Sequence, residues 1–88
     1  MTVASTHAKN PLLGWDISAS AKADSGEKIA RAQIIVNGSN EYDETFDPPI
    51  NNWQRQLSQQ GEYPGDNTVE VIVSSDKGED TAAEDSWN

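Results

Sequence analysis

Apolar and polar residues alternate with a period of two along most of the chain, which is the pattern of β-strands with one buried face. The clearest run covers residues 68–74, where Val69, Val71 and Val73 lie on one side of the predicted strand. Residues 15–22 alternate in the same way. We therefore expect both segments to be strands that contribute one face to a core.

A hairpin is predicted in the middle of the chain. Residues 30–36 alternate as a strand and end at Asn37-Gly38, a pair that favours a tight hairpin turn because both residues tolerate positive φ. Residues 42–46 form the predicted returning strand. Asp47-Pro48-Pro49 is expected to end its pairing, because proline has no N–H to donate to a neighbouring strand.

Two further strands have weaker signals. Residues 53–58 are interpreted as a strand, although their glutamine and leucine content also suits a helical turn. The segment Asp76-Lys77-Gly78-Glu79 predicts a turn, and residues 81–87 could then close the sheet as a last strand.

Six or seven short strands separated by turn signals, with no helix, predict an all-β protein built as an antiparallel β-sandwich. The 88 residues suit one domain. We expect residues 1–11 to be a flexible tail, or at most a weak edge strand, and residues 12–88 to be the domain. The predicted core consists of Trp15, Ile17, Ile34, Val36, Trp53, Val69, Val71 and Val73.

Several short patterns follow one another in a characteristic order over residues 15–81. They are Ile17, Ala19 and Ala21 followed by Asp24 and Gly26; Val36-Asn37-Gly38; Trp53 with Leu57; and Gly65-Asp66-Asn67 followed by Val69, Val71, Asp76 and Gly78. This order resembles the immunoglobulin-like modules of the E-set type found in bacterial and phage proteins. The resemblance implies an immunoglobulin-like β-sandwich. It implies no single function, because the proteins that share this fold have many roles.

The composition narrows the classes of partner. Fifteen Asp and Glu residues against six Lys and Arg residues give a net charge of −9. Such a surface repels phosphate groups, so we expect no binding to nucleic acid or to anionic lipid. The absence of cysteine excludes disulfides and thiolate chemistry.

The sequence leaves the localisation unknown. No apolar run is long enough to cross a membrane, so membrane insertion is not expected, and no signal peptide is recognisable. If the chain is a segment of a larger protein, that protein could lie on a cell surface, be secreted or belong to a virion.

Aromatic residues are the candidates for ligand binding. Trp87 and Tyr42 could stack on a sugar ring or contact another ligand, whereas Trp15 and Trp53 fall on faces predicted to be buried. Tyr63 precedes the valine-rich strand, where a corner tyrosine would bond back to the backbone.

Acidic residues near the last turn are the candidates for metal binding. Asp76, Glu79 and Asp80 could supply oxygen ligands to calcium, which is the only cofactor that the sequence suggests. Lys77 lies inside the segment, and the spacing of a calcium-binding loop is missing. Turn formation by solvated acids is therefore the preferred interpretation.

No catalytic arrangement is recognisable. His7 is the only histidine and lies in the expected tail, so a nucleophile would have no general base beside it. We expect a non-catalytic immunoglobulin-like binding or spacer module, monomeric, that meets a protein or a polysaccharide through loops or a sheet edge. The alternatives are a calcium-dependent or carbohydrate-binding domain and, more remotely, a small enzyme.

Overall fold

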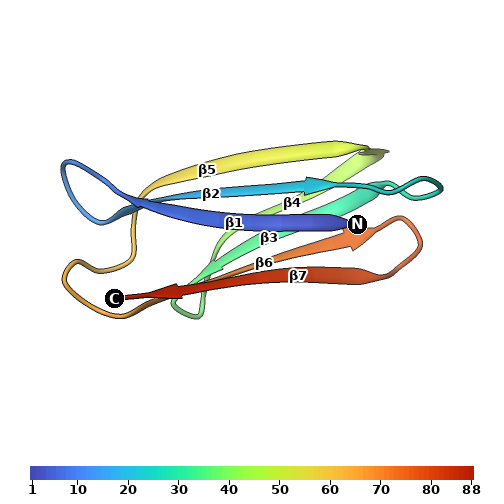
Figure 1. The fold of residues 1–88 in the computed structure, drawn as a ribbon. Helices are drawn as coiled ribbons and strands as arrows, with labels where there is room; N and C mark the ends of the chain where they lie inside the picture. The colour runs from blue at the N-terminus through green and yellow to red at the C-terminus, as the bar shows by residue number, and fades with distance from the viewer.

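The computed structural model describes all 88 residues as two antiparallel sheets packed face to face, without a helix (Figure 1). Sheet A has the strand order β1-β2-β5, with bounds Thr2–Lys9, Trp15–Lys22 and Asn52–Gln60. Sheet B has the order β4-β3-β6-β7, with bounds Ser39–Ile50, Ile29–Val36, Asn67–Ser75 and Asp80–Trp87. These seven strands in two sheets confirm the predicted all-β sandwich.

The core lies between the two sheets and is built by the alternation along each strand. Its eleven buried apolar residues are Ile17, Ala19, Ala21, Ile29, Ala32, Ile34, Val36, Trp53, Val69, Val71 and Val73. Seven of the eight residues expected in the core are among them. The eighth, Trp15, is half-buried at the start of β2, where it packs against the core from one end of the sandwich.

Residues 2–9 form the edge strand β1, so the flexible tail is wrong for this segment and the edge-strand alternative is confirmed. Strand β1 pairs with β2 along its whole length, from Thr2 opposite Lys22 to Lys9 opposite Trp15. Only Val3 carries a sizeable apolar side chain towards the core, so the hydrophobic pattern gives almost no signal for this strand. Backbone hydrogen bonds to β2 and packing against β6 and β7 hold it in place.

The paired prolines do not end β4 as expected. Thr45 pairs with Arg31, and pairing resumes where Ile50 lies opposite Ile29. The four residues between them, which include Pro48 and Pro49, have no pairing partner in β3, so the prolines need no N–H donor there. The same irregularity in β3 buries Ile29, whereas Ala30 remains half-exposed.

Residues 53–58 lie within strand β5, so the helical alternative for this segment is wrong. The strand pairs with β2 in sheet A, and Trp53 and Leu57 point towards the core while Gln54 and Gln56 are exposed. The backbone N–H and C=O groups of this segment form hydrogen bonds with β2, whereas in a helical turn they would bond to one another.

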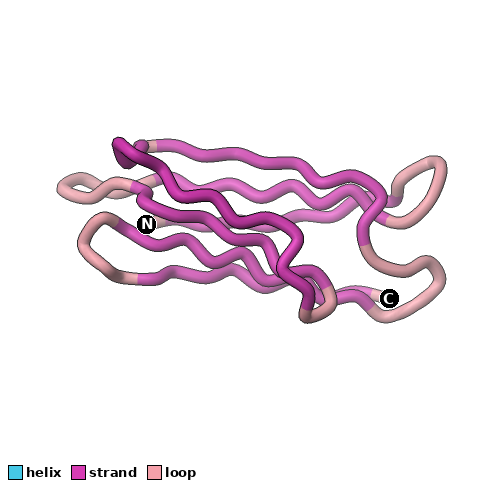
Figure 2. Tube along the Cα trace, turned by 180° about the vertical axis from the view of Figure 1, so that it is seen from behind, coloured by secondary structure: helices cyan, strands magenta, loops and turns pink.

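Loops gather at the two ends of the sandwich, as the pink segments of Figure 2 show. The end that carries the β1–β2 loop (residues 10–14), the β3–β4 turn (37–38) and the β5–β6 loop (61–66) is called the loop end below. The opposite end carries residues 23–28 and the β6–β7 turn (76–79). Neighbouring strands are antiparallel, so connections far apart in the sequence meet at the same end.

Candidate functional site

Four aromatic residues meet at the loop end and are called the aromatic cluster: His7, Trp15, Tyr63 and Trp87. The ring of His7 stacks on Trp87, with centroids 3.9 Å apart and planes 5° from parallel. Trp15 makes edge contacts to His7 at 5.5 Å, to Trp87 at 5.5 Å and to Tyr63 at 5.8 Å. The cluster therefore joins β1, β2, β7 and the β5–β6 loop.

His7 joins the two sheets at their β1–β7 side. Its Nδ1 lies 2.6 Å from a carboxylate oxygen of Asp85 on β7, as a hydrogen-bonded pair. Together with the stacking on Trp87, this contact holds β1 against β7, although no backbone hydrogen bonds link the two strands. The role of His7 could not be predicted from the sequence, because it depends on β1 being ordered.

A buried asparagine shapes the β5–β6 loop. Asn67 is only 1% exposed, and its Oδ1 accepts hydrogen bonds from the Glu62 N–H at 2.7 Å and from Asn37 Nδ2 at 3.1 Å. Its Nδ2 donates to the carbonyl oxygens of Glu62 at 2.8 Å and Gly65 at 3.2 Å. The indole N–H of Trp15 donates to the same Glu62 carbonyl, also at 2.8 Å. Asn67 thus connects the loop to the aromatic cluster.

The close approach of Asn67 also requires a glycine beside it. Gly61 has a φ of +71°, and a Cβ at this position would lie 2.3 Å from Asn67 Oδ1. A larger residue would have to displace the asparagine side chain as well as adopt a left-handed backbone. Gly61 and Asn67 therefore determine the shape of the loop together.

The β1–β2 loop displays two leucines to solvent. Leu12 is 84% exposed and Leu13 is 68% exposed, so neither side chain belongs to the core. Asn10 holds them there: its Oδ1 accepts hydrogen bonds from the Leu12 N–H at 2.8 Å and the Leu13 N–H at 3.3 Å. The turn residues Pro11 and Gly14, which bracket the two leucines, are the sequence signal that could have predicted their exposure.

Tyr63 completes the apolar surface of the loop end. It is 52% exposed, and the structure gives no hydrogen bond from its hydroxyl to the backbone, so the expected corner role is wrong. Lys9 lies over its ring, with Nζ 3.8 Å from the centroid. Leu12, Leu13 and Tyr63 are the exposed large hydrophobic residues of the protein, and all three lie in loops at this end.

The two aromatic residues expected to bind ligands lie in different places. Trp87 belongs to the aromatic cluster, where His7 covers one face of its indole ring and its Nε1 is buried without a hydrogen-bond partner. Tyr42 lies at the opposite side of the sandwich, on β4, where its hydroxyl accepts a hydrogen bond from Trp53 Nε1 at 3.2 Å and donates one to Glu44. Burial, and then the hydrogen bond to Glu44, raise the pKa of Tyr42 above its ordinary value. The two candidates do not form one site.

The acidic candidates form a turn stabilised by hydrogen bonds. Asp76 accepts the Lys28 N–H at 2.9 Å, and Ser75 Oγ accepts the N–H groups of Lys77 and Glu79 at 3.1 and 3.3 Å. Asp80 begins β7. No group of three or more His, Asp or Glu side chains in the structure is placed to hold a metal ion. The three candidates are therefore not brought together as a ligand set.

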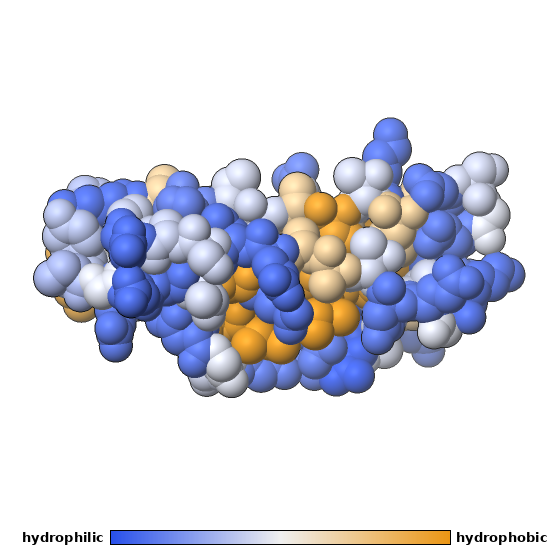
Figure 3. All heavy atoms as spheres, turned by 60° about the horizontal axis from the view of Figure 1, so that its bottom comes forward, coloured by the Kyte–Doolittle hydropathy of each residue, from blue (hydrophilic) through white to orange (hydrophobic).

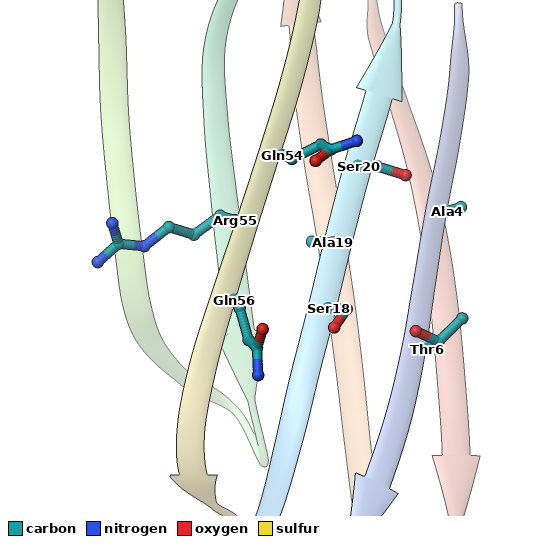
Figure 4. A pocket seen from close by; sticks show the side chains of 8 residues that line it. All are labelled: Ala4, Thr6, Ser18, Ala19, Ser20, Gln54, Arg55 and Gln56. Atoms are coloured by element: carbon teal, nitrogen blue, oxygen red, sulfur yellow. The ribbon is translucent and has the colours of Figure 1, made fainter.

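A shallow groove of about 510 Å³ runs over the outer face of sheet A (Figure 4). Hydroxyl and amide side chains from all three strands line it: Thr6, Ser18, Ser20, Gln54 and Gln56. Arg55 also borders the groove, but its guanidinium points away from it towards β4 (Figure 4). The groove offers hydrogen bonds and no aromatic surface.

Charge is divided unequally between the sheets. The strands of sheet A carry Lys9, Lys22 and Arg55 against one acid, Asp16, a net charge of +2. The strands of sheet B carry one base, Arg31, against eight acids, a net charge of −7; the acids are Glu41, Asp43, Glu44, Asp47, Glu70, Asp80, Glu84 and Asp85. Sheet A therefore has a small positive charge, although the whole chain has a net charge of −9.

The one base of sheet B is paired with an acid of the neighbouring strand. Arg31 donates to both carboxylate oxygens of Asp43, at 2.9 and 2.6 Å. These hydrogen bonds lower the pKa of Asp43 below its ordinary value. Because the pKa is lower in the folded than in the unfolded chain, where it is about 3.9, the pair stabilises the fold above that pH. The contribution is lost as the pH falls through the folded-state pKa.

We expect Arg31→Gln to return the pKa of Asp43 towards its ordinary value, because the charged hydrogen-bond donor is gone. An NMR titration of the Asp43 carboxyl carbon measures this directly. Lys77→Gln removes one positive charge from the β6–β7 turn and serves as the control. An Asp43 pKa that stays low in Arg31→Gln would contradict the assigned cause.

Apolar surface is also present away from the loops. In the view from below, apolar residues gather midway along the molecule, between more polar ends (Figure 3). This surface lies over the strands rather than over the loops, so the leucines and Tyr63 of the loop end form a separate feature.

The comparisons with known proteins are negative: no protein-family description and no curated protein matches the chain. The structure contains no helix long and apolar enough to span a membrane. The fold and the loop end described above therefore carry the functional argument.

Proposed function

We propose that this β-sandwich is a non-catalytic immunoglobulin-like binding module of the bacterial and phage type, and that it binds a protein partner through its loop end. Seven antiparallel strands in a three-plus-four arrangement, within 88 residues and with loops at both ends, support the immunoglobulin-like assignment. A rigid sandwich that presents loops is a common scaffold for recognition.

The placement of the exposed apolar residues carries the proposal. Exposing leucine costs free energy relative to burying it, by about 1.5–3 kcal/mol for a full side chain. Leu12 and Leu13 are nevertheless held in solvent by the Asn10 hydrogen bonds, and Tyr63 is exposed in another loop at the same end of the sandwich. Burial against an apolar pocket of a partner would recover this free energy.

The chemistry of the loop end favours a protein over a carbohydrate. Sugar rings stack on open aromatic faces, but His7 covers a face of Trp87, and Lys9 lies over the ring of Tyr63. Two adjacent leucines offer branched aliphatic surface, which suits an apolar protein pocket better than a hydroxyl-rich glycan. Lys9 adds one positive charge at the rim, which suits a partner with an acidic residue beside its pocket.

Leu12→Ser combined with Leu13→Ser tests the proposal. Proteins captured from an extract of the source organism by the immobilised wild-type chain are compared with those captured by this double variant. We expect at least one partner to be lost, with a drop in affinity of tenfold or more, about 1.4 kcal/mol, because the apolar contact is removed. The matched control, Ser25→Ala with Lys77→Ala, changes exposed residues at the opposite end and should keep the partner.

The capture experiment can be interpreted only if the double variant remains folded. We expect its free energy of unfolding, measured by urea denaturation, to change by less than about 0.5 kcal/mol, because both side chains are already in solvent. If the variant retains all partners with unchanged affinity, the loop end is not the binding surface and the proposal fails.

A carbohydrate-binding function is the alternative, and the hydroxyl- and amide-lined groove of sheet A favours it. NMR titration with neutral oligosaccharides would shift the amide signals of Ser18, Ser20 and Gln56 if the groove binds sugar. Tryptophan fluorescence should not respond, because no tryptophan lines the groove. For the calcium-dependent variant of this alternative, an equal unfolding midpoint in calcium and in EDTA would count against it.

A further inference from the structure

Each sheet has one outer strand at either side, and the outer edge of that strand has no backbone partner. The four outer strands are β1 and β5 in sheet A, and β4 and β7 in sheet B, and their surroundings differ. At one side of the sandwich, β1 packs against β7 and β6, and the His7–Asp85 and His7–Trp87 contacts bridge the two edge strands. At the other side, β5 of sheet A and β4 of sheet B are the outermost strands. Tyr42 and Trp53 connect them through a side-chain hydrogen bond.

Most of the β5 edge lacks the features that usually prevent a strand from pairing with another chain. Natural edge strands are shortened, charged, bulged or interrupted by proline, because unpaired backbone groups attract further strands. Strand β5 has no proline, no acid and a single charge, Arg55, and its pairing with β2 is regular from Asn52 to Leu57. The register shifts only near its C-terminal end, between Leu57 and Gln60, where Gln59 has a positive φ. The guanidinium of Arg55 lies 5.0 Å from the ring of Tyr42, so it covers the open side rather than projecting from the outer face.

Strand β4 is protected differently along its length. Pro48 and Pro49 and the surrounding bulge block its C-terminal part. Residues 39–46 contain no proline and carry three acids, Glu41, Asp43 and Glu44; their register with β3 shifts once, at Glu41. This part of β4 can accept a neighbouring strand, but its charge selects against an acidic one.

We propose that a second copy of this chain docks at this side, with β5 of each copy paired antiparallel to residues 39–46 of β4 in the other. Strands β4 and β5 lie at the same side of the sandwich and run in opposite directions. A two-fold axis parallel to the strands exchanges the positions of sheets A and B and keeps the strand directions. It therefore brings β5 beside the partner's β4 twice, which closes a symmetric dimer.

Charge selects this arrangement over the other symmetric one. A two-fold axis perpendicular to the sheets would pair β5 with β5 and β4 with β4, and would place the acids of two β4 strands side by side. The proposed axis instead continues each sheet A, with its net charge of +2, into a sheet B with its net charge of −7. In the dimer, each positively charged sheet A is therefore continued by the negatively charged sheet B of the other copy.

The pairing would also cover apolar side chains along the open side. Tyr42, Phe46 and Leu57 pack on the rim of the core and are only half-buried in the single chain. A second copy would remove them from water at the centre of the interface, while the backbone groups of β4 and β5 gain hydrogen bonds. The monomer expected from the sequence is then the form present at low concentration.

Cysteine cross-linking tests the strand pairing, because the chain has no native cysteine. Gln54→Cys, Gln56→Cys and Ser58→Cys, each on β5, are mixed one at a time with Asn40→Cys on β4 under mild oxidation. We expect a disulfide-linked heterodimer with at least one β5 position, in excess over either homodimer. Ser18→Cys, on the central strand of sheet A, is the control for random collision. Linkage no better than the Ser18→Cys control, or a predominant β5–β5 homodimer, would overturn the proposal.

Sedimentation equilibrium tests the role of charge without cysteine. Gln54→Glu with Gln56→Glu adds acids to exposed positions of β5 and should weaken dimerisation about tenfold or more, because they would face the acids of β4. Gln54→Lys with Gln56→Lys changes the same two positions and should strengthen it. A chain that stays monomeric at about 1 mM, where only ~4 kcal/mol of association is needed, would refute the proposal. Equal dimerisation of the two variants would also refute it.

Discussion

We expect Ile34→Ala to lower the free energy of unfolding by about 2–5 kcal/mol, the largest effect of any single substitution considered for this protein. Ile34 has 0% exposure and lies in the middle of β3, the strand that pairs with both β4 and β6. Removing three carbon atoms there loses their burial and leaves a cavity that neighbouring strands cannot close. Urea denaturation followed by circular dichroism measures the loss.

The effect should be large for the whole fold because the core is small. An 88-residue domain has a total stability of about 4–13 kcal/mol, and only eleven apolar residues are buried in the core. Loss of ~3 kcal/mol should lower the thermal midpoint by more than about 10 °C.

Ile35→Ala is the matched control for Ile34→Ala. Ile35 is the next residue along β3 and has the same side chain, but it faces outward and is half-exposed. Its replacement should cost clearly less than that of Ile34. If the two substitutions cost the same, the inward and outward faces of β3 would be assigned incorrectly.

Asn67→Ala should lower the free energy of unfolding by about 2–4 kcal/mol, because it removes a buried side chain that makes four hydrogen bonds, each worth about 0.5–1.5 kcal/mol. The Asn67 side chain serves the Glu62 N–H, the Glu62 and Gly65 carbonyls and the amide of Asn37. The losses at neighbouring groups are not additive, so the total is smaller than the sum of the separate hydrogen bonds. Urea denaturation again gives the magnitude.

A second measurement would localise the effect of Asn67→Ala. Trp15 donates to the same Glu62 carbonyl that Asn67 holds, so freeing the β5–β6 loop should change the environment of Trp15 and alter the fluorescence of the folded protein. Asn52→Ala, an exposed residue on β5, is the control and should change neither stability nor fluorescence appreciably. A loss below 1 kcal/mol in Asn67→Ala would mean that the loop is held by other contacts.

The strands with a continuous apolar face could be predicted from the sequence, whereas β1 could not. Strands β2, β3 and β6 contribute most of the buried core, so their period of two is visible. Strand β1 has small and polar residues on both faces and is ordered by backbone pairing with β2 and by the contacts of His7. Such long-range contacts leave no periodic trace in a local stretch of sequence.

The candidate site was only partly visible for the same reason. Trp87 was recognised as a candidate, but its neighbours in the cluster come from residues 7, 15 and 63, which the sequence places far apart. Asn67 looks like an ordinary turn residue in the sequence, and only the folded chain shows that its side chain is buried with four hydrogen-bond contacts.

The sequence by itself determined the all-β class, six of the seven strands and the alternation that buries Ile17, Ile34 and the valines of β6, because these follow from local periodicity and turn chemistry. Only the tertiary structure decided that Leu12, Leu13 and Tyr63 are exposed at one end, that His7 bridges β1 and β7, and that β5 and β4 lie open at one side. These features depend on which strands become neighbours, and that choice is made by packing across the whole sandwich rather than by any single segment.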